Sequence, residues 1–64
     1  MTLEEVLKAD KPARCRVGDF LYVYHPESDW LPITQSCVNC CTCVDTMEAD
    51  DPEAPQEGWE HYDG

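Results

Sequence analysis

Apolar positions near the start of the chain predict a short amphipathic helix. Three of them share one helical face: Leu3, Val6 and Leu7. Thr2 and Glu5 form a capping box, in which the Thr2 hydroxyl accepts from the Glu5 amide while the Glu5 carboxylate accepts from the Thr2 amide. The helix is expected to end at residues 10–12, because the residue before Pro12 is pushed out of the helical region. So short a helix is unstable alone and must dock on the rest of the chain.

Residues 14–24 carry the strongest strand pattern in the chain. Two sets of side chains would point to opposite faces, with Val17, Leu21 and Val23 on one face and Phe20, Tyr22 and Tyr24 on the other. Because both faces are apolar or aromatic, the pattern favours a central strand, or a strand with one face kept for a partner. Gly18-Asp19 predicts a bulge or bend within this strand.

A turn over residues 25–29 is expected to bring the chain back as a second strand over residues 30–37. Pro32 has no amide hydrogen to donate, so this strand is an edge or is interrupted there. A hairpin centred near Glu27 pairs positions whose numbers sum to about 54. This register places Cys15 opposite residue 39, within the cysteine-rich stretch that follows.

The composition of the chain changes after residue 47. Residues 44–47 predict a short third strand, whereas residues 48–64 have no periodicity and few apolar side chains. The chain therefore divides into one small metal-stapled domain over residues 1–47 and an acidic, flexible tail over residues 48–64. Two aromatic residues of the tail, Trp59 and Tyr62, either fold back onto the core or form a short linear motif that docks on a partner.

Together these elements predict an α+β mini-protein. It would have a short N-terminal helix and a two- to three-stranded antiparallel β-meander, stapled by a cysteine-bound metal and followed by the acidic C-terminal tail. The 64 residues make one domain at most. A chain of this size buries only about 60% of its unfolded surface and is marginal without a staple.

Four of the five cysteines lie within seven residues: Cys37, Cys40, Cys41 and Cys43. Two successive Cys-x-x-Cys steps predict a structural zinc held by Cys37, Cys40 and Cys43, because such a step turns two thiolates to the same side. A tetrahedral site needs a fourth ligand, for which there are four candidates: Cys41, Cys15, His25 and His61. The hairpin register favours Cys15 and puts His25 at the far tip. The predicted zinc ligands are therefore Cys15, Cys37, Cys40 and Cys43, with Cys41 spare or a substitute.

Other chemistries stay open for the same cysteines. Over Cys37 to Cys43 the spacing resembles part of the cysteine run of bacterial iron–sulfur ferredoxins, without the Cys-Pro ending of that run, and this resemblance implies an iron–sulfur cluster as the alternative cofactor. Reduced thiols packed in a core, or a disulfide framework with one thiol left over, are two further interpretations. Met1 is followed by Thr-Leu-Glu-Glu and not by a signal peptide, so a cytoplasmic location is expected.

The charge of the chain is strongly negative and unevenly placed. The formal net charge is −10, and no Lys or Arg follows Arg16. Such a surface repels nucleic acid and membrane phosphates and favours a basic protein partner. The predicted partner-binding residues are Asp45, Glu48, Asp50, Asp51, Glu53, Glu57, Trp59, Glu60 and Tyr62. The plain alternative is that these carboxylates only keep a small protein soluble.

The sequence contains no motif that indicates catalysis. It has neither a Gly-rich phosphate loop nor a serine-hydrolase elbow, and its two histidines lie far from the cysteines along the chain. The longest apolar run, Phe20 to Tyr24, is far shorter than the roughly 20 residues of a membrane-spanning helix. We therefore expect a protein that is not an enzyme and does not bind a membrane or nucleic acid.

The function expected from these features is that of a small acidic zinc-binding interaction protein. It would bind, and inhibit or regulate, a basic partner that handles nucleic acid; by size and charge it is similar to the small acidic inhibitors that bacteriophages encode. One alternative is a metal or redox carrier that uses the Cys37–Cys43 cluster. A second alternative is a cysteine-rich peptide precursor.

Overall fold

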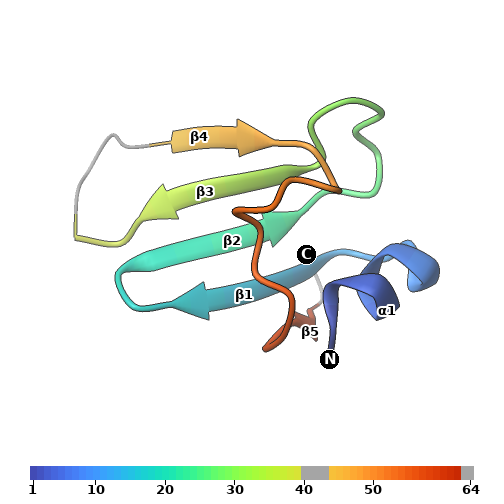
Figure 1. The fold of residues 1–64 in the computed structure, drawn as a ribbon, viewed down its shortest axis with the longest axis horizontal. Coiled ribbons are helices and arrows are strands. Elements are labelled where there is room, and N and C mark those ends of the chain that lie inside the picture. The colour runs from blue at the N-terminus through green and yellow to red at the C-terminus, as the bar shows by residue number, and fades with distance from the viewer. Residues whose placement is uncertain (40–43, 63–64) are drawn as a thin grey trace.

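The described part of the chain forms one short helix and one antiparallel sheet. The computed structural model describes residues 1–39 and 44–62. The elements are α1 (Leu3–Ala9), β1 (Ala13–Val17), β2 (Phe20–Tyr24), β3 (Ile33–Cys37), β4 (Val44–Met47) and β5 (Glu60–His61). The strand order is β4-β3-β2-β1-β5 (Figure 1). The α+β class with a short helix and an antiparallel sheet is confirmed, although the described sheet has five strands instead of two or three.

The helix forms as its sequence predicts. The Glu5 amide donates to Thr2 Oγ1 at 3.2 Å and the Thr2 amide donates to Glu5 Oε1 at 3.0 Å, so the capping box is present. The Thr2 amide and the Thr2 hydroxyl both donate to Glu5 Oε1, and they lower the pKa of the Glu5 carboxyl because they stabilise its charged form. Asp10 ends the helix in the left-handed conformation with φ 53°. Its carboxylate accepts from the Tyr24 hydroxyl at 3.2 Å, which ties the helix end to the sheet.

The prediction of one strand over residues 14–24 is wrong, because the chain reverses at Gly18-Asp19. Val17 pairs with Phe20, so β1 and β2 are joined by a two-residue turn. Gly18 has φ 58°, and a positive φ at the first central position is that of a type II′ hairpin turn, which glycine adopts without strain. Of the residues placed on the two apolar faces, only Val17 therefore belongs to β1, and the other five lie on the two faces of β2.

The predicted register of the second hairpin is also wrong. Phe20 pairs with Cys37 and Tyr24 with Ile33, whereas Cys15 pairs with Tyr22 on the neighbouring strand. Pro32 explains part of the shift, since it donates no hydrogen bond and the returning strand begins only after it. The connection is closed by the amide of His25, which donates to the carbonyl of Pro32 at 2.7 Å.

The third strand predicted over residues 44–47 is confirmed as β4. It pairs with β3, Ser36 against Val44 and Ile33 against Met47. The Thr46 amide donates to Asp45 Oδ1 at 2.9 Å. Asp45 thus binds a backbone amide of the edge strand β4 and places a negative charge on that edge. Both effects discourage pairing with another chain.

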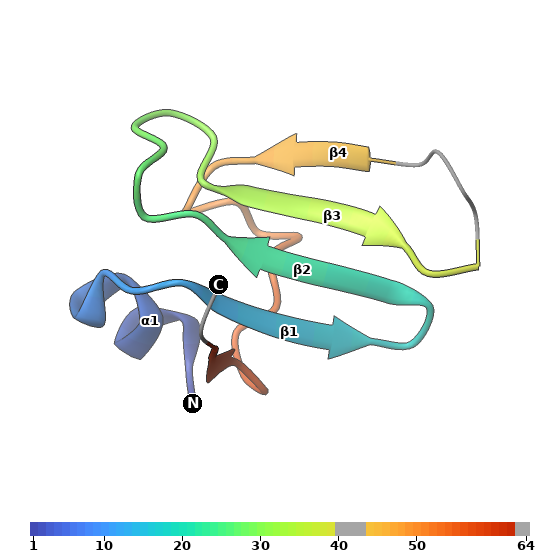
Figure 2. The ribbon, with the colours of Figure 1, turned by 180° about the vertical axis from the view of Figure 1, so that it is seen from behind.

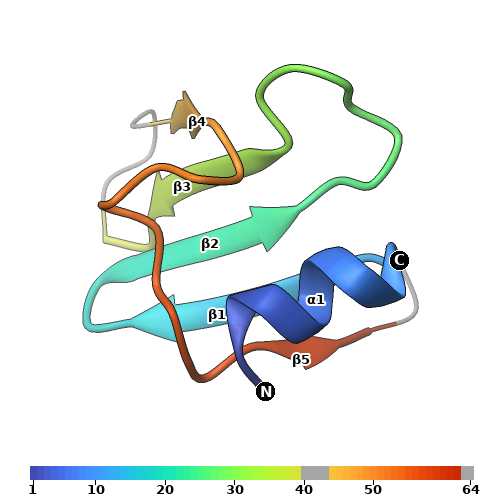
Figure 3. The same cartoon turned by 45° about the vertical axis from the view of Figure 1, so that its right-hand side comes forward.

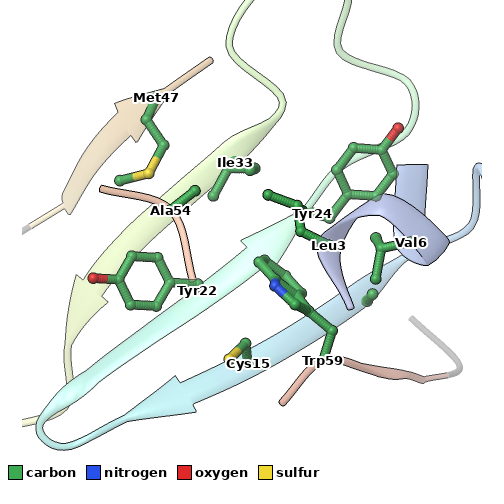
Figure 4. Close-up of a cluster of buried hydrophobic side chains, with 10 residues drawn as sticks. Leu3, Val6, Cys15, Tyr22, Tyr24, Ile33, Met47, Ala54 and Trp59 are labelled. Carbon is green, nitrogen blue, oxygen red and sulfur yellow. The ribbon is translucent and has the colours of Figure 1, made fainter. Parts of the chain in front are cut away.

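The core lies on one face of the sheet. Alternate residues of the strands point to this side, and ten side chains of the described chain are buried there: Leu3, Val6, Ala13, Cys15, Tyr22, Tyr24, Ile33, Met47, Ala54 and Trp59 (Figure 4). Ile33 and Val6 are completely buried. The opposite face carries the intervening residues, and in the view from behind no other described segment passes in front of β2 or β3 (Figure 2).

The segment after β4 does not behave as the flexible tail inferred from its composition, but packs over the core face of the sheet (Figures 1 and 3). The Leu3 amide donates to the carbonyl of Gln56 at 2.9 Å, and the Trp59 amide to that of Met1 at 3.0 Å. Trp59 is 2% exposed, and its indole N–H donates to the carbonyl of Pro55 at 2.8 Å. A helix of seven residues is too short to cover this face alone, so residues 48–59 complete the apolar layer.

Candidate functional site

Of the four cysteines between Cys37 and Cys43, Cys37 is the one that lies among the described residues. It is the last residue of β3, is half-buried and pairs with Phe20. With Phe20, Gln35, Val44 and Asp45 it lines a shallow hollow of about 250 Å³ at this end of the sheet. Cys40, Cys41 and Cys43 lie outside the described residues.

The structure does not bring Cys15 to Cys37. Cys15 lies in β1, in line with Tyr22 and Gln35, whereas Cys37 lies two strands away and two residues farther along. Strand spacing of ~4.8 Å and a rise of ~3.3 Å per residue put their Cα atoms about 12 Å apart. Sulfurs that share one Zn²⁺ at ~2.3 Å must lie within about 4 Å of each other. Only the predicted register favours Cys15 as a ligand, and the observed pairing differs from it.

Cys15 instead belongs to the core. It is 2% exposed, and its Sγ donates to the carbonyl of Glu57 at 3.4 Å. Gly58 lies against it with φ 87°, and a Cβ at that position would lie 3.5 Å from the Cys15 sulfur. The Cys15 thiol thus helps to fix the position of residues 57–58, which precede the buried Trp59.

The two histidines lie at the opposite end of the sheet from Cys37. His25 follows β2, and its Nε2 lies 3.1 Å from Thr34 Oγ1. His61 pairs with Ala13, and its Nδ1 lies 3.1 Å from the carbonyl of Pro12. Over residues 1–39 and 44–62, no three His, Cys, Asp or Glu side chains are grouped as a metal site would require.

Alkaline pH is expected to destabilise the fold through two buried acids. Burial raises the pKa of the Cys15 thiol, and burial together with the hydrogen bond to Asp10 raises the pKa of the Tyr24 hydroxyl. The folded state therefore favours the neutral forms. Their contribution to stability is complete below the unfolded values, ~8.5 for Cys and ~10 for Tyr, and is lost as pH rises through the folded values.

Urea unfolding between about pH 7 and pH 11 measures this loss. The free energy of unfolding should fall across the range, and Cys15→Ala should remove the part of the fall that begins first. A free energy that is constant or rises over this range would contradict the assignment of both groups.

The residues predicted to bind a partner do not form one surface. Trp59 is buried in the core and cannot be an exposed anchor. Glu60 pairs with Arg14, Oε1 to Nε at 3.1 Å, and the Arg14 guanidinium lies 5.6 Å from the centroid of the Tyr62 ring. Asp45 lies on β4. The remaining acidic residues of the prediction lie on the segment that covers the core: Glu48, Asp50, Asp51, Glu53 and Glu57.

The sheet separates half of the acidic side chains from the two arginines. Helix α1 and residues 48–57 lie on the same side of the sheet, and we call them the covering layer (Figure 3). The helix adds Glu4 and Glu5 to its carboxylates. Arg14 and Arg16 alternate with the buried Ala13 and Cys15 and so point to the other face.

A groove of about 290 Å³ lies within the covering layer, between α1 and residues 49–56. Apolar side chains and carboxylates both line it, and its lining residues are Leu3, Glu4, Leu7, Ala49, Asp50, Asp51, Pro52 and Gln56. Leu7 is half-buried and packs against the core, so it forms the exposed continuation of the core into the groove. Acidic side chains stand on both walls, with Glu4 on the helix and Asp50 and Asp51 opposite.

Of the residues that line the groove, Asp50 and Asp51 are predicted from the sequence as partner-binding residues, whereas Glu4 and Leu7 are not. A signal for them exists in the helix itself, because Leu3 and Leu7 are four residues apart and Glu4 lies beside that stripe. Nothing in the sequence indicates that residues 49–56 lie next to it. Over the described residues, no helix is long and apolar enough to span a bilayer.

No protein-family model matches this chain, and no curated protein or solved structure shows significant similarity to it. The functional conclusion therefore rests on the covering layer and its groove.

Proposed function

We propose that this protein is a binding module, without catalytic activity, for a basic protein partner. The observation that supports the proposal best is the groove beside α1, which combines an apolar lining with carboxylates on both walls. The net charge of −10 favours a basic partner over the rest of the molecule as well. Proteins that handle nucleic acid carry extended basic surfaces, so a module of this kind would inhibit or regulate such a protein by covering that surface.

Charge and apolar area would play different parts in the complex. Carboxylates on the covering layer would steer a basic partner and speed association, an effect that salt screens. The apolar lining would slow dissociation, because desolvated contacts at the centre of an interface carry most of its binding energy.

A zinc ion is part of this proposal as a structural staple. β3 ends at Cys37 and β4 begins at Val44, so the cysteine run connects two paired strands. A connection between two strands with Cys-x-x-Cys spacing is a common setting for a structural zinc. Cys37, Cys40 and Cys43 are the proposed ligands, and Cys41 becomes the fourth candidate because Cys15 and both histidines lie elsewhere in the fold. An iron–sulfur cluster on the same cysteines is the alternative.

The proposed function predicts a site-specific loss of association rate on charge neutralisation. Asp50→Asn, Glu53→Gln and Glu57→Gln remove three charges from the covering layer. Asp19→Asn, Glu27→Gln and Asp29→Asn remove the same number from the hairpin tips. Proteins retained from a lysate by the wild type are identified, purified and measured for association rate between about 50 and 500 mM salt.

We expect the retained proteins to be basic. The covering-layer variant should associate about 3- to 10-fold more slowly at low salt and show a flatter salt dependence, whereas the matched hairpin variant should stay within about 2-fold of the wild type. Equal losses of association rate in both variants would mean that net charge alone, and not the covering layer, speeds association. Retained proteins with no basic bias would refute the proposed function.

A further inference from the structure

We propose that the groove between α1 and residues 49–56 binds one large apolar side chain of the partner, with Lys or Arg residues of the partner on both sides of that anchor. This inference rests on the proposed function and specifies the segment that the module recognises. The groove volume of about 290 Å³ lies at the lower end of the ~300–1,000 Å³ of small-molecule pockets. It therefore suits a single side chain better than a whole helix or strand.

The apolar lining explains the anchor. Leu3 is 3% exposed and belongs to the core, while Leu7 one turn later is only half-buried. Ala49 and Pro52 stand on the opposite wall. An apolar side chain placed between these walls would cover the exposed part of Leu7 and extend the core outward, at about 25 cal/mol for each Å² of apolar surface removed from water.

The walls explain the flanking charges. Glu4 pairs with Lys8 at 3.4 Å, but the two side chains are 79% and 77% exposed, and such a surface pair contributes at most about 1 kcal/mol. Glu4 is therefore available to an incoming cation. Asp50 is exposed on the other wall, beside Asp51, whose Oδ1 accepts from the Glu53 amide at 2.8 Å. Cations on both sides of the anchor would each meet a carboxylate.

The two walls are fixed relative to each other. The Leu3 amide donates to the carbonyl of Gln56 at 2.9 Å, which joins the helix to the opposite segment. Within that segment, the Asp51 amide donates to the carbonyl of Glu48 at 3.2 Å and the Ala54 amide to that of Asp51 at 3.1 Å. A groove with preset walls costs less ordering on binding, which favours a short segment as its ligand.

Selection from a displayed library of random ~12-residue peptides against the full chain tests the inference. The enriched peptides should share an apolar residue flanked by Lys or Arg. Selected peptides are then synthesised, and their affinities are measured for the wild type and for variants of the groove. Amide NMR spectra of each variant confirm that its fold is intact.

Three variants of the groove and one matched control separate the anchor from the charges. Ala49→Leu fills the groove without changing charge and should weaken binding by at least about 10-fold, mainly through faster dissociation. Leu7→Ala removes part of the lining and should act in the same direction. Glu4→Gln with Asp50→Asn should weaken binding about 3- to 10-fold and flatten its salt dependence, whereas Glu27→Gln with Asp29→Asn, at equal net charge, should change it by less than about 2-fold.

Several outcomes would overturn the inference. Enriched peptides without the basic–apolar–basic pattern, no enriched peptide at all, or an Ala49→Leu protein that binds as tightly as the wild type would each do so. A concentration-dependent dimer that Ala49→Leu abolishes would make a second copy the occupant of the groove. The proposed function is tested separately by the covering-layer variant. If that variant still associated more slowly with basic proteins, the proposed function would stand although the inference about the groove was wrong. If it associated as fast as the wild type, both would be wrong.

Discussion

Replacing Trp59 by alanine is expected to lower the free energy of unfolding by about 3–5 kcal/mol. Trp59 is 2% exposed and packs over β1 and β2 (Figure 4). Its removal would leave a cavity beneath residues 48–59 and break the hydrogen bond from its indole to the carbonyl of Pro55. A domain of this size has little stability to lose, so the variant should be largely unfolded at moderate temperature. Urea unfolding followed by circular dichroism measures the change.

Trp30 provides the matched control. It lies in the connection between β2 and β3 and is 76% exposed. Trp30→Ala should therefore change the free energy of unfolding by no more than about 0.5 kcal/mol. Deletion of residues 48–64 should unfold the chain, because it removes Ala54, Trp59 and β5 together. A Trp59→Ala protein as stable as Trp30→Ala would mean that this segment is not part of the core.

The second large effect is expected for zinc. If the cysteine run holds a structural zinc, the purified protein should contain one Zn²⁺, and Cys37→Ser should weaken its binding by at least about 100-fold. The binding free energy of a structural zinc is ~10–16 kcal/mol, and the loss of one of four ligands would remove about a quarter of it. Cys15→Ala should keep the zinc and lose stability instead, since Cys15 packs in the core against residues 57–58.

Native mass spectrometry and a colorimetric chelator measure the metal, and urea unfolding measures the stability. Loss of zinc from Cys15→Ala would mean that Cys15 approaches Cys37 in the metal-bound protein. A brown protein with visible absorption would mean that the cysteines hold an iron–sulfur cluster and not zinc. Chelation should disturb amide exchange in β3 and β4 more than the environment of Trp59, because the core residues lie outside the cysteine run.

The sequence by itself determined the features that depend on neighbours along the chain. The capping box of Thr2 and Glu5, the helix end before Pro12 and the strand over residues 44–47 all follow from local hydrogen bonding, from the geometry of proline or from short apolar alternation. The acidic balance also follows from composition alone. None of these properties depends on which distant residue lies opposite a given residue in the folded chain.

Only the tertiary structure decided the features that depend on pairing. Gly18-Asp19 fits either a bend within one strand or a reversal between two, and the reversal pairs Val17 with Phe20. That choice moves every later register and separates Cys15 from Cys37. A change of register alters every partner at once, and alternation within a single strand indicates which side chains share a face but not which residue lies opposite.

The packing of residues 48–62 shows the same limit most clearly. Their composition resembles that of a flexible tail, yet the sheet leaves an apolar face that α1 is too short to cover. Ala54 and Trp59 fill that face, and this brings Asp50 and Asp51 beside Glu4. Ala54 and Trp59 do not form a periodic pattern in the sequence, but they suffice once a preformed surface buries them. The groove beside α1 therefore exists only in the folded chain.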